Sequence, residues 1–83
     1  MNPEAVKALL VAAFPQAEAI EVTGEGSKYN VTIVSEEFAS LRPVAKQQRV
    51  YAPLNEHIAS GVIHAVSMRT LTPEEWRKAK LFG

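Results

Sequence analysis

Residues 19–34 have the sequence AIEVTGEGSKYNVTIV, which is the most informative part of the chain about its fold. Apolar and polar residues alternate over 19–23 and again over 28–34, the pattern of strands that bury one face. Between them lies Gly24-Glu25-Gly26-Ser27, a turn cluster whose glycines permit positive φ angles, so we expect a β-hairpin with a loop of more than two residues. The side chains expected to share its buried face are Ile20, Val22, Tyr29, Val31 and Ile33.

The residues before the hairpin predict a helix. Asn2 can cap its first turn and Pro3 suits its first position. Phe14 precedes Pro15 and is therefore pushed out of the helical region, which ends the helix. The expected apolar stripe of this helix consists of Val6, Leu9, Leu10 and Ala13.

A longer helical region follows the hairpin. After a turn or short helical piece at 36–41, helical periodicity begins at Arg42. Pro53 lies inside this region, so we expect a kink or a break into two helices near residues 50–52. Gly61 fits the position just past the helix end. The expected apolar stripe, with Val50 beside it, consists of Val44, Gln47, Tyr51, Leu54 and Ile58.

The last part of the chain predicts a strand and a closing helix. The strand is expected from Val62 to Arg69. Thr72 as cap and Glu75 as the acid of a capping box begin the helix, and Trp76 is its expected apolar contact. Helices and strands are mixed in the order αββα(α)βα, which predicts one α+β domain over residues 1–83, with helices covering one face of a three-stranded sheet.

Composition excludes several classes of protein. Nine basic and nine acidic side chains give a net charge of zero, which argues against nucleic-acid binding through the overall field but leaves a local basic patch open. The chain has no cysteine, so it holds no disulfide framework and no thiolate metal site of its own. The first residues lack a secretory-signal pattern, and no apolar run approaches the roughly 20 residues of a membrane span. We therefore expect a soluble cytoplasmic protein.

The sequence predicts no catalytic centre. It contains no cysteine nucleophile, no G-x-S-x-G elbow and no H-E-x-x-H metal motif. Gly24-Glu25-Gly26 leads from one strand into another rather than into a helix, so it lacks the context of a dinucleotide-binding loop. We therefore expect a protein that is not an enzyme.

Two features are candidates for function. His64 lies within the third predicted strand; its neutral imidazole can bind a metal, but it can also bond a backbone carbonyl or face water. Arg42, Lys46 and Arg49 are spaced four and three residues apart and share roughly one helix face. That face could follow a phosphate backbone or be an ordinary solvated face.

Four segments together resemble the BolA family, in particular its bacterial IbaG-like branch, and the resemblance covers nearly the whole chain. They are RPVAKQQRVYAPL at 42–54, GVIHAVSM at 61–68, TPEEW at 72–76 and VTGEGS at 22–27. The resemblance implies an αββααβα fold related to the type II KH domain, with a three-stranded mixed sheet and a helix-turn-helix around Arg42 to Ser60. The phosphate-clamping GXXG motif of KH domains is absent, which argues against generic KH-like RNA binding.

The resemblance also implies a non-catalytic role in iron–sulfur cluster trafficking. Members of the family pair with monothiol glutaredoxins of the Cys-Gly-Phe-Ser type, and the pair holds a [2Fe-2S] cluster. Glutaredoxin and glutathione supply the thiolates, and the BolA partner supplies the histidine of the third strand, here His64. Many members add a second histidine or cysteine from the first hairpin loop. The matching residue here is Lys28, a poor iron ligand, so we expect either a single ligand from this chain or a more labile cluster.

The residues expected to frame the rim of the cluster are Gly24, Gly26, Ser27 and Lys28. The wider family implies an alternative function, a DNA-binding regulator of stress response and morphology that uses the helix-turn-helix. Arg42, Lys46 and Arg49 would then contact DNA or a protein partner. A stress-linked interaction module without a cluster is a third hypothesis. The resemblance leaves a homodimer open and implies no membrane partner.

Overall fold

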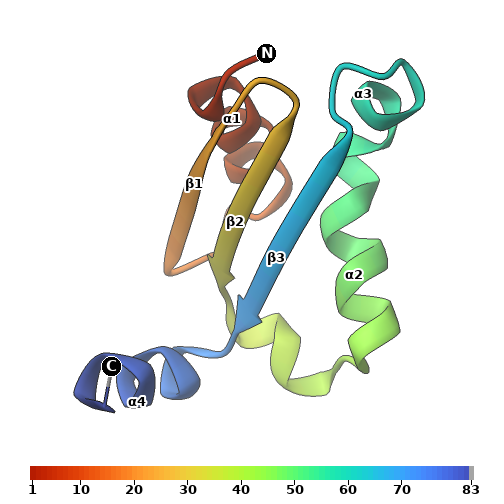
Figure 1. Ribbon diagram of the computed structural model, residues 1–83. Helices are drawn as coiled ribbons and strands as arrows, with labels where there is room; N and C mark the ends of the chain where they lie inside the picture. The colour runs from red at the N-terminus through yellow and green to blue at the C-terminus, as the bar shows by residue number, and fades with distance from the viewer. Residues whose placement is uncertain (83) are drawn as a thin grey trace.

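The computed structural model describes residues 1–82, whose helices and strands follow the order αββααβα (Figure 1). Short 3₁₀ helices at Glu36–Ser40 and Ala52–Leu54 precede and follow α2. The regular elements are α1 (Pro3–Ala13), β1 (Ala19–Glu25), β2 (Lys28–Val34), α2 (Pro43–Tyr51), α3 (Asn55–Ala59), β3 (Ala65–Leu71) and α4 (Pro73–Phe82). This is the α+β order that the sequence predicts.

The three strands form one mixed sheet in the order β1-β2-β3. β1 and β2 are antiparallel, whereas β2 and β3 are parallel. Because Glu25 pairs with Lys28, the hairpin turn is only Gly26-Ser27, and the expectation of a longer loop is wrong. Gly24 explains the difference: its φ of 137° and the lack of a Cβ, which would collide with the Lys28 carbonyl oxygen, let β1 continue to the turn.

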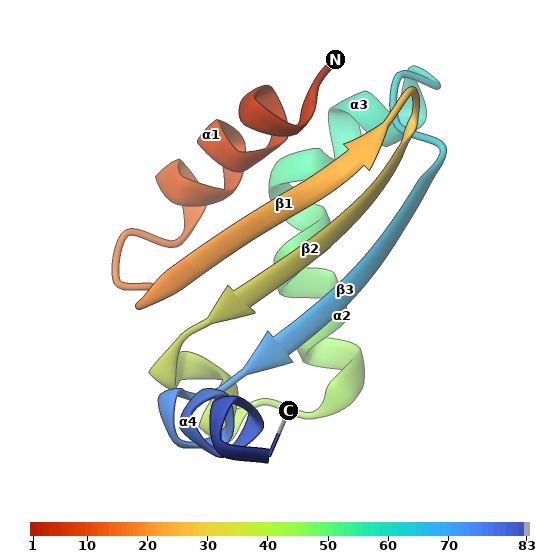
Figure 2. The ribbon, with the colours of Figure 1, turned by 60° about the vertical axis from the view of Figure 1, so that its left-hand side comes forward.

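The core lies between one face of the sheet and the helices α1 to α3, while α4 lies at the end of the sheet where β3 ends (Figure 2). The hairpin alternation holds on β2, whose Tyr29, Val31 and Ile33 are buried. Helix and loop residues complete the core, namely Val6, Leu10, Phe14, Phe38, Val50, Leu54 and Ile63.

The predicted break at Pro53 is confirmed, and the apolar stripe predicted across it holds only in its last part, where Leu54 is buried and Ile58 packs against the core. Val44 is 65% exposed and Gln47 is also exposed, whereas Val50 is fully buried. The stripe assumed one helical phase from residue 44 to residue 58. The 3₁₀ turn at Ala52–Leu54 changes that phase, so the face that Leu54 and Ile58 bury does not continue back to Val44 and Gln47 on α2.

The third strand begins later than predicted, at Ala65 rather than Val62, and ends at Leu71 rather than Arg69. Gly61, with a φ of 83°, ends the helical region as expected, and residues 62–64 then cross from α3 to the sheet. The buried Ile63 fixes this crossing, because its N–H donates to the carbonyl of His57 at 3.0 Å. His64 is therefore the residue before the strand and not part of it.

The predicted helix starts are confirmed. Asn2 accepts a hydrogen bond from the N–H of Ala5 at 2.8 Å. At α4 the N–H of Thr72 donates to the Glu75 carboxylate at 2.8 Å, and the N–H of Glu75 donates to the Thr72 hydroxyl at 3.2 Å, which is a complete capping box. Trp76 on this helix is partly buried. None of the helices described is long and apolar enough to cross a membrane.

Candidate functional site

His64 lies where the hairpin turn meets the start of β3. Its backbone N–H donates to the carbonyl of Ser27 at 2.8 Å, and the N–H of Ala65 reaches the same oxygen at 3.3 Å. Lys28 is the register partner of Ala65. The fold therefore brings His64 beside Ser27 and Lys28, two of the residues predicted to form the rim around it.

The imidazole of His64 is exposed and unbonded. The structure contains no hydrogen bond or ion pair from this ring to any residue in 1–82, so the alternative in which it bonds a backbone carbonyl is wrong. Its Nε2 lies 3.7 Å from the position that a Cβ on Gly61 would occupy, an ordinary contact distance. The backbone of His64 is thus fixed while its ring nitrogens are available to an outside partner.

Within residues 1–82, His64 does not belong to a ready-made cluster of metal ligands. No group of three or more His, Cys, Asp or Glu residues within 1–82 could hold a metal ion. His57 lies on α3, and the exposed Lys28 carries an ammonium that is no metal ligand. The fit to an iron–sulfur cluster is therefore limited to one imidazole nitrogen, with every thiolate supplied from outside.

The hydroxyl of Tyr29 binds the backbone of the turn beside His64. This buried residue places its hydroxyl 2.7 Å from the carbonyl of Gly26 and 2.7 Å from the carbonyl of Met1. Gly24, in contrast, pairs with Tyr29 inside the hairpin and is not part of the turn. The sequence predicts Tyr29 as a core residue but does not predict the contacts of its hydroxyl. The general rule that a buried tyrosine needs a hydrogen-bond partner for its hydroxyl could have indicated them.

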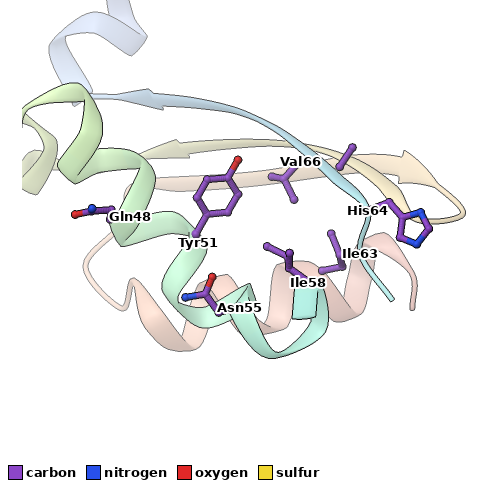
Figure 3. Close-up of a pocket in the computed structure, with 8 residues that line it drawn as sticks. Gln48, Tyr51, Asn55, Ile58, Ile63, His64 and Val66 are labelled. Atoms are coloured by element: carbon purple, nitrogen blue, oxygen red, sulfur yellow. The ribbon is translucent and has the colours of Figure 1, made fainter. Parts of the chain in front are cut away.

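A groove of about 620 Å³ opens beside His64, between α2–α3 and the first half of β3 (Figure 3). The sequence did not predict this groove. Ile58, Ile63 and Val66 give it an apolar floor, and the imidazole of His64 points away from it at one end. Its remaining lining residues are Gln48, Tyr51, Asn55 and Ala65.

The predicted basic face does not form as one exposed surface. Arg49 is half-buried: its Nη2 donates to the carbonyl of Ala13 at 2.6 Å, and its Nε lies 3.3 Å from the Glu37 carboxylate. Its guanidinium also lies 4.0 Å from the centre of the Phe14 ring, so it connects α1 to α2 rather than facing solvent.

The other two basic residues remain available at the surface. Arg42 is exposed and precedes α2 as its N-cap residue, and Lys46 is partly exposed in the first turns of the helix. The start of α2 lies near α4, at the opposite end of the sheet from the hairpin turn (Figure 1). The basic residues at the start of α2 are thus a separate site from His64 and the hairpin turn.

Comparison with known proteins identifies similar chains. A family model described as BolA-like protein matches residues 5–75. The acid stress protein IbaG of Escherichia coli is 43% identical over 84 residues, covering 100% of this chain and 99% of that protein. The DNA-binding transcriptional regulator BolA of Vibrio cholerae is 44% identical over 55 residues, covering 66% of this chain and 51% of that protein. The crystal structure of a Bol-like protein from Babesia bovis superimposes with a TM-score of 0.80 at 26% identity, covering 96% of this chain and 94% of that one.

Proposed function

The chain belongs to the BolA-like family, and from this premise we propose that it is a non-catalytic adaptor in iron–sulfur cluster trafficking. His64 would ligate a [2Fe-2S] cluster that the chain shares with a monothiol glutaredoxin and glutathione. In this proposal the cluster is cargo that passes between proteins, and this chain contributes one of its ligands.

The observation that carries the proposal is the state of His64. Its backbone N–H is held by Ser27 while its ring is exposed and unbonded, as a ligand presented to a partner should be. An imidazole in place of a thiolate lowers the negative charge around a [2Fe-2S] cluster and raises its reduction potential, as in Rieske centres. The chain has no cysteine, so in this proposal the thiolates come from the partner and from glutathione.

Lys28 supports an electrostatic role for the hairpin turn. Its side chain is exposed, and its place opposite Ala65 puts a positive charge at the end of the sheet that carries His64. A cluster with thiolate ligands is anionic, so a nearby ammonium attracts it without coordinating iron. The turn would then help to hold the assembly while His64 alone ligates.

The proposal is tested by reconstitution of the chain with a monothiol glutaredoxin, iron, sulfide and glutathione. We expect His64→Ala to change the visible absorption and circular dichroism of the mixed complex. His57→Ala is the matched control, because it removes the other histidine of the chain, and it should leave both spectra as in the wild type. Identical spectra for wild type and His64→Ala would exclude His64 as the ligand.

A second candidate function is DNA binding through the start of α2. It is favoured by the name of the Vibrio cholerae relative and by the exposure of Arg42 and Lys46. The test is affinity for duplex DNA against salt: loss of both charges in Arg42→Ala/Lys46→Ala should weaken binding and reduce the salt slope. Lys7→Ala on α1 is the control, because it removes an exposed positive charge from a helix outside the proposed contact. If the chain does not bind DNA at low ionic strength, or if the double substitution leaves the affinity unchanged, DNA binding through the start of α2 is excluded.

A further inference from the structure

The outer edge of β3 carries unpaired backbone groups. Among residues 1–82, β3 is the last strand of the sheet and pairs with β2 alone. Two hydrogen bonds show which backbone groups of β3 point toward β2. The Ala65 N–H donates to the Ser27 carbonyl, and the Leu71 carbonyl accepts from the Ser35 N–H. Because residues alternate along a parallel ladder, the N–H and C=O groups of the even-numbered residues face outward. These residues are Val66, Met68 and Thr70.

This edge is also unprotected. Proteins commonly block a free edge with charges or proline, and β1, on the other side of the sheet, carries Glu21 and Glu25. β3 contains no proline, and its single charged residue is Arg69, whose backbone groups face β2. An open row of donors and acceptors of this kind is a template for another strand.

The groove beside His64 runs along the same edge, since Ala65 and Val66 are among its lining residues. None of the eight side chains that line it is a lysine, arginine, aspartate or glutamate, so nothing in it would hold a phosphodiester backbone. Its floor is apolar, and its helical wall carries the amides of Gln48 and Asn55. Such a lining matches an uncharged peptide that forms main-chain hydrogen bonds on one side and inserts an apolar side chain on the other.

We propose that this groove receives an extended, uncharged segment of the thiol-bearing partner, which adds as a fourth strand to the edge of β3. The inference rests on the proposed function and deepens it, because the groove ends at His64. A partner whose thiolates ligate the same cluster as His64 would lie next to the end of the groove. Strand addition would fix the orientation of the partner, and ligation by His64 would complete the contact.

The experiment is amide hydrogen exchange, followed by NMR on the ¹⁵N-labelled chain with and without a monothiol glutaredoxin. Strand addition protects alternate amides: exchange at Val66, Met68 and Thr70 should slow by about tenfold or more in the complex, as expected when exposed amides become hydrogen-bonded. The amides of Ser67 and Arg69 already face β2 and should change little.

Two matched variants test the groove itself. Gln48→Trp fills it from the helical wall, whereas Gln47→Trp places the same side chain on the next, exposed residue outside it. We expect the first to weaken the glutaredoxin complex by about tenfold, roughly 1.4 kcal/mol, and the second to bind as the wild type does. Far-UV circular dichroism of both variants verifies that α2 is intact.

Four outcomes would overturn the inference. Strand addition is wrong if a cluster-loaded complex forms without slower exchange at alternate amides of β3. It is also wrong if the two tryptophan variants bind equally well. Either result leaves the proposed function standing. Alternate protection produced by single-stranded DNA and not by the glutaredoxin assigns the groove to a nucleic acid. Failure of the glutaredoxin to bind at all overturns both the inference and the proposed function.

Discussion

His64 and Ser27 are joined by a backbone hydrogen bond of 2.8 Å that connects the end of the α3–β3 crossing to the β1–β2 turn. The bond leaves the imidazole of His64 exposed while it fixes the backbone from which the imidazole projects. The position of the candidate ligand therefore depends on the hairpin turn, and changes in that turn should affect both stability and cluster binding.

Lys28→His should make the shared cluster longer-lived. The substitution places a second imidazole at the position where many family members offer a ligand, beside the start of β3. We expect the visible absorption of the complex to decay several-fold more slowly in the presence of a chelator, because two ligands from one chain must dissociate instead of one. Lys7→His on α1 is the control and should leave the decay rate unchanged. An unchanged rate for Lys28→His would place residue 28 away from the cluster.

Tyr29→Phe should destabilise the fold by about 1 kcal/mol. The substitution keeps the buried ring but removes the hydroxyl, whose single proton is shared between the carbonyls of Gly26 and Met1. Tyr51→Phe is the matched control, because no hydrogen bond of its hydroxyl is found among the residues described, and it should change stability by less than about 0.5 kcal/mol. Urea unfolding of the three proteins measures both effects. Equal midpoints for the two variants would show that the Tyr29 hydroxyl does not hold the turn.

Gly24 and Gly26 should respond differently to alanine. Gly26→Ala places a side chain in open space at a φ of 65°, which costs about 1–2 kcal/mol. Gly24→Ala brings a Cβ into the Lys28 carbonyl at a φ of 137°, so its cost should exceed about 3 kcal/mol. Thermal unfolding measures both. The reverse order would contradict the close contact between Gly24 and the Lys28 carbonyl as the reason for a glycine at position 24.

Glu75 should make stability depend on pH in the acidic range. The hydrogen bond from the Thr72 backbone N–H lowers the pKa of Glu75 below its ordinary value of 4.5. A carboxylate with a lowered pKa stabilises the fold above the pKa of the unfolded chain, and the effect is lost as the pH falls through the folded value. Glu75→Gln should therefore reduce the loss of stability between pH 5 and about pH 3, whereas Glu74→Gln, at an exposed ion pair with Lys78, should not. Urea titrations at several pH values make the comparison, and equal acid slopes for wild type and Glu75→Gln would contradict it.

The local features of the fold could be predicted because each is encoded over a few residues. The hairpin alternation, the Asn2 cap and the Thr72–Glu75 capping box depend on neighbours along the chain, and the structure contains all three. The proximity of His64 to the turn followed from the family resemblance rather than from any local pattern.

The remaining features depend on packing between distant segments. Arg49 appeared to belong to a solvated face, but its partners Ala13 and Glu37 come from other elements. The helical phase does not continue through the turn at Pro53, so the stripe that holds at Leu54 and Ile58 fails at Val44 and Gln47. A groove between a helix and a strand edge has no signature in the sequence of either one.

Ligation by His64 can be observed directly by pulsed EPR of the reduced [2Fe-2S] complex, assembled from this chain labelled with ¹⁵N-histidine and an unlabelled glutaredoxin. We expect a strong ¹⁵N hyperfine coupling from a directly bound imidazole, retained in His57→Ala and lost in His64→Ala. A spectrum without this coupling in the wild-type complex, or one that keeps it in His64→Ala, would contradict the assignment of His64 as the ligand that this chain gives to the cluster.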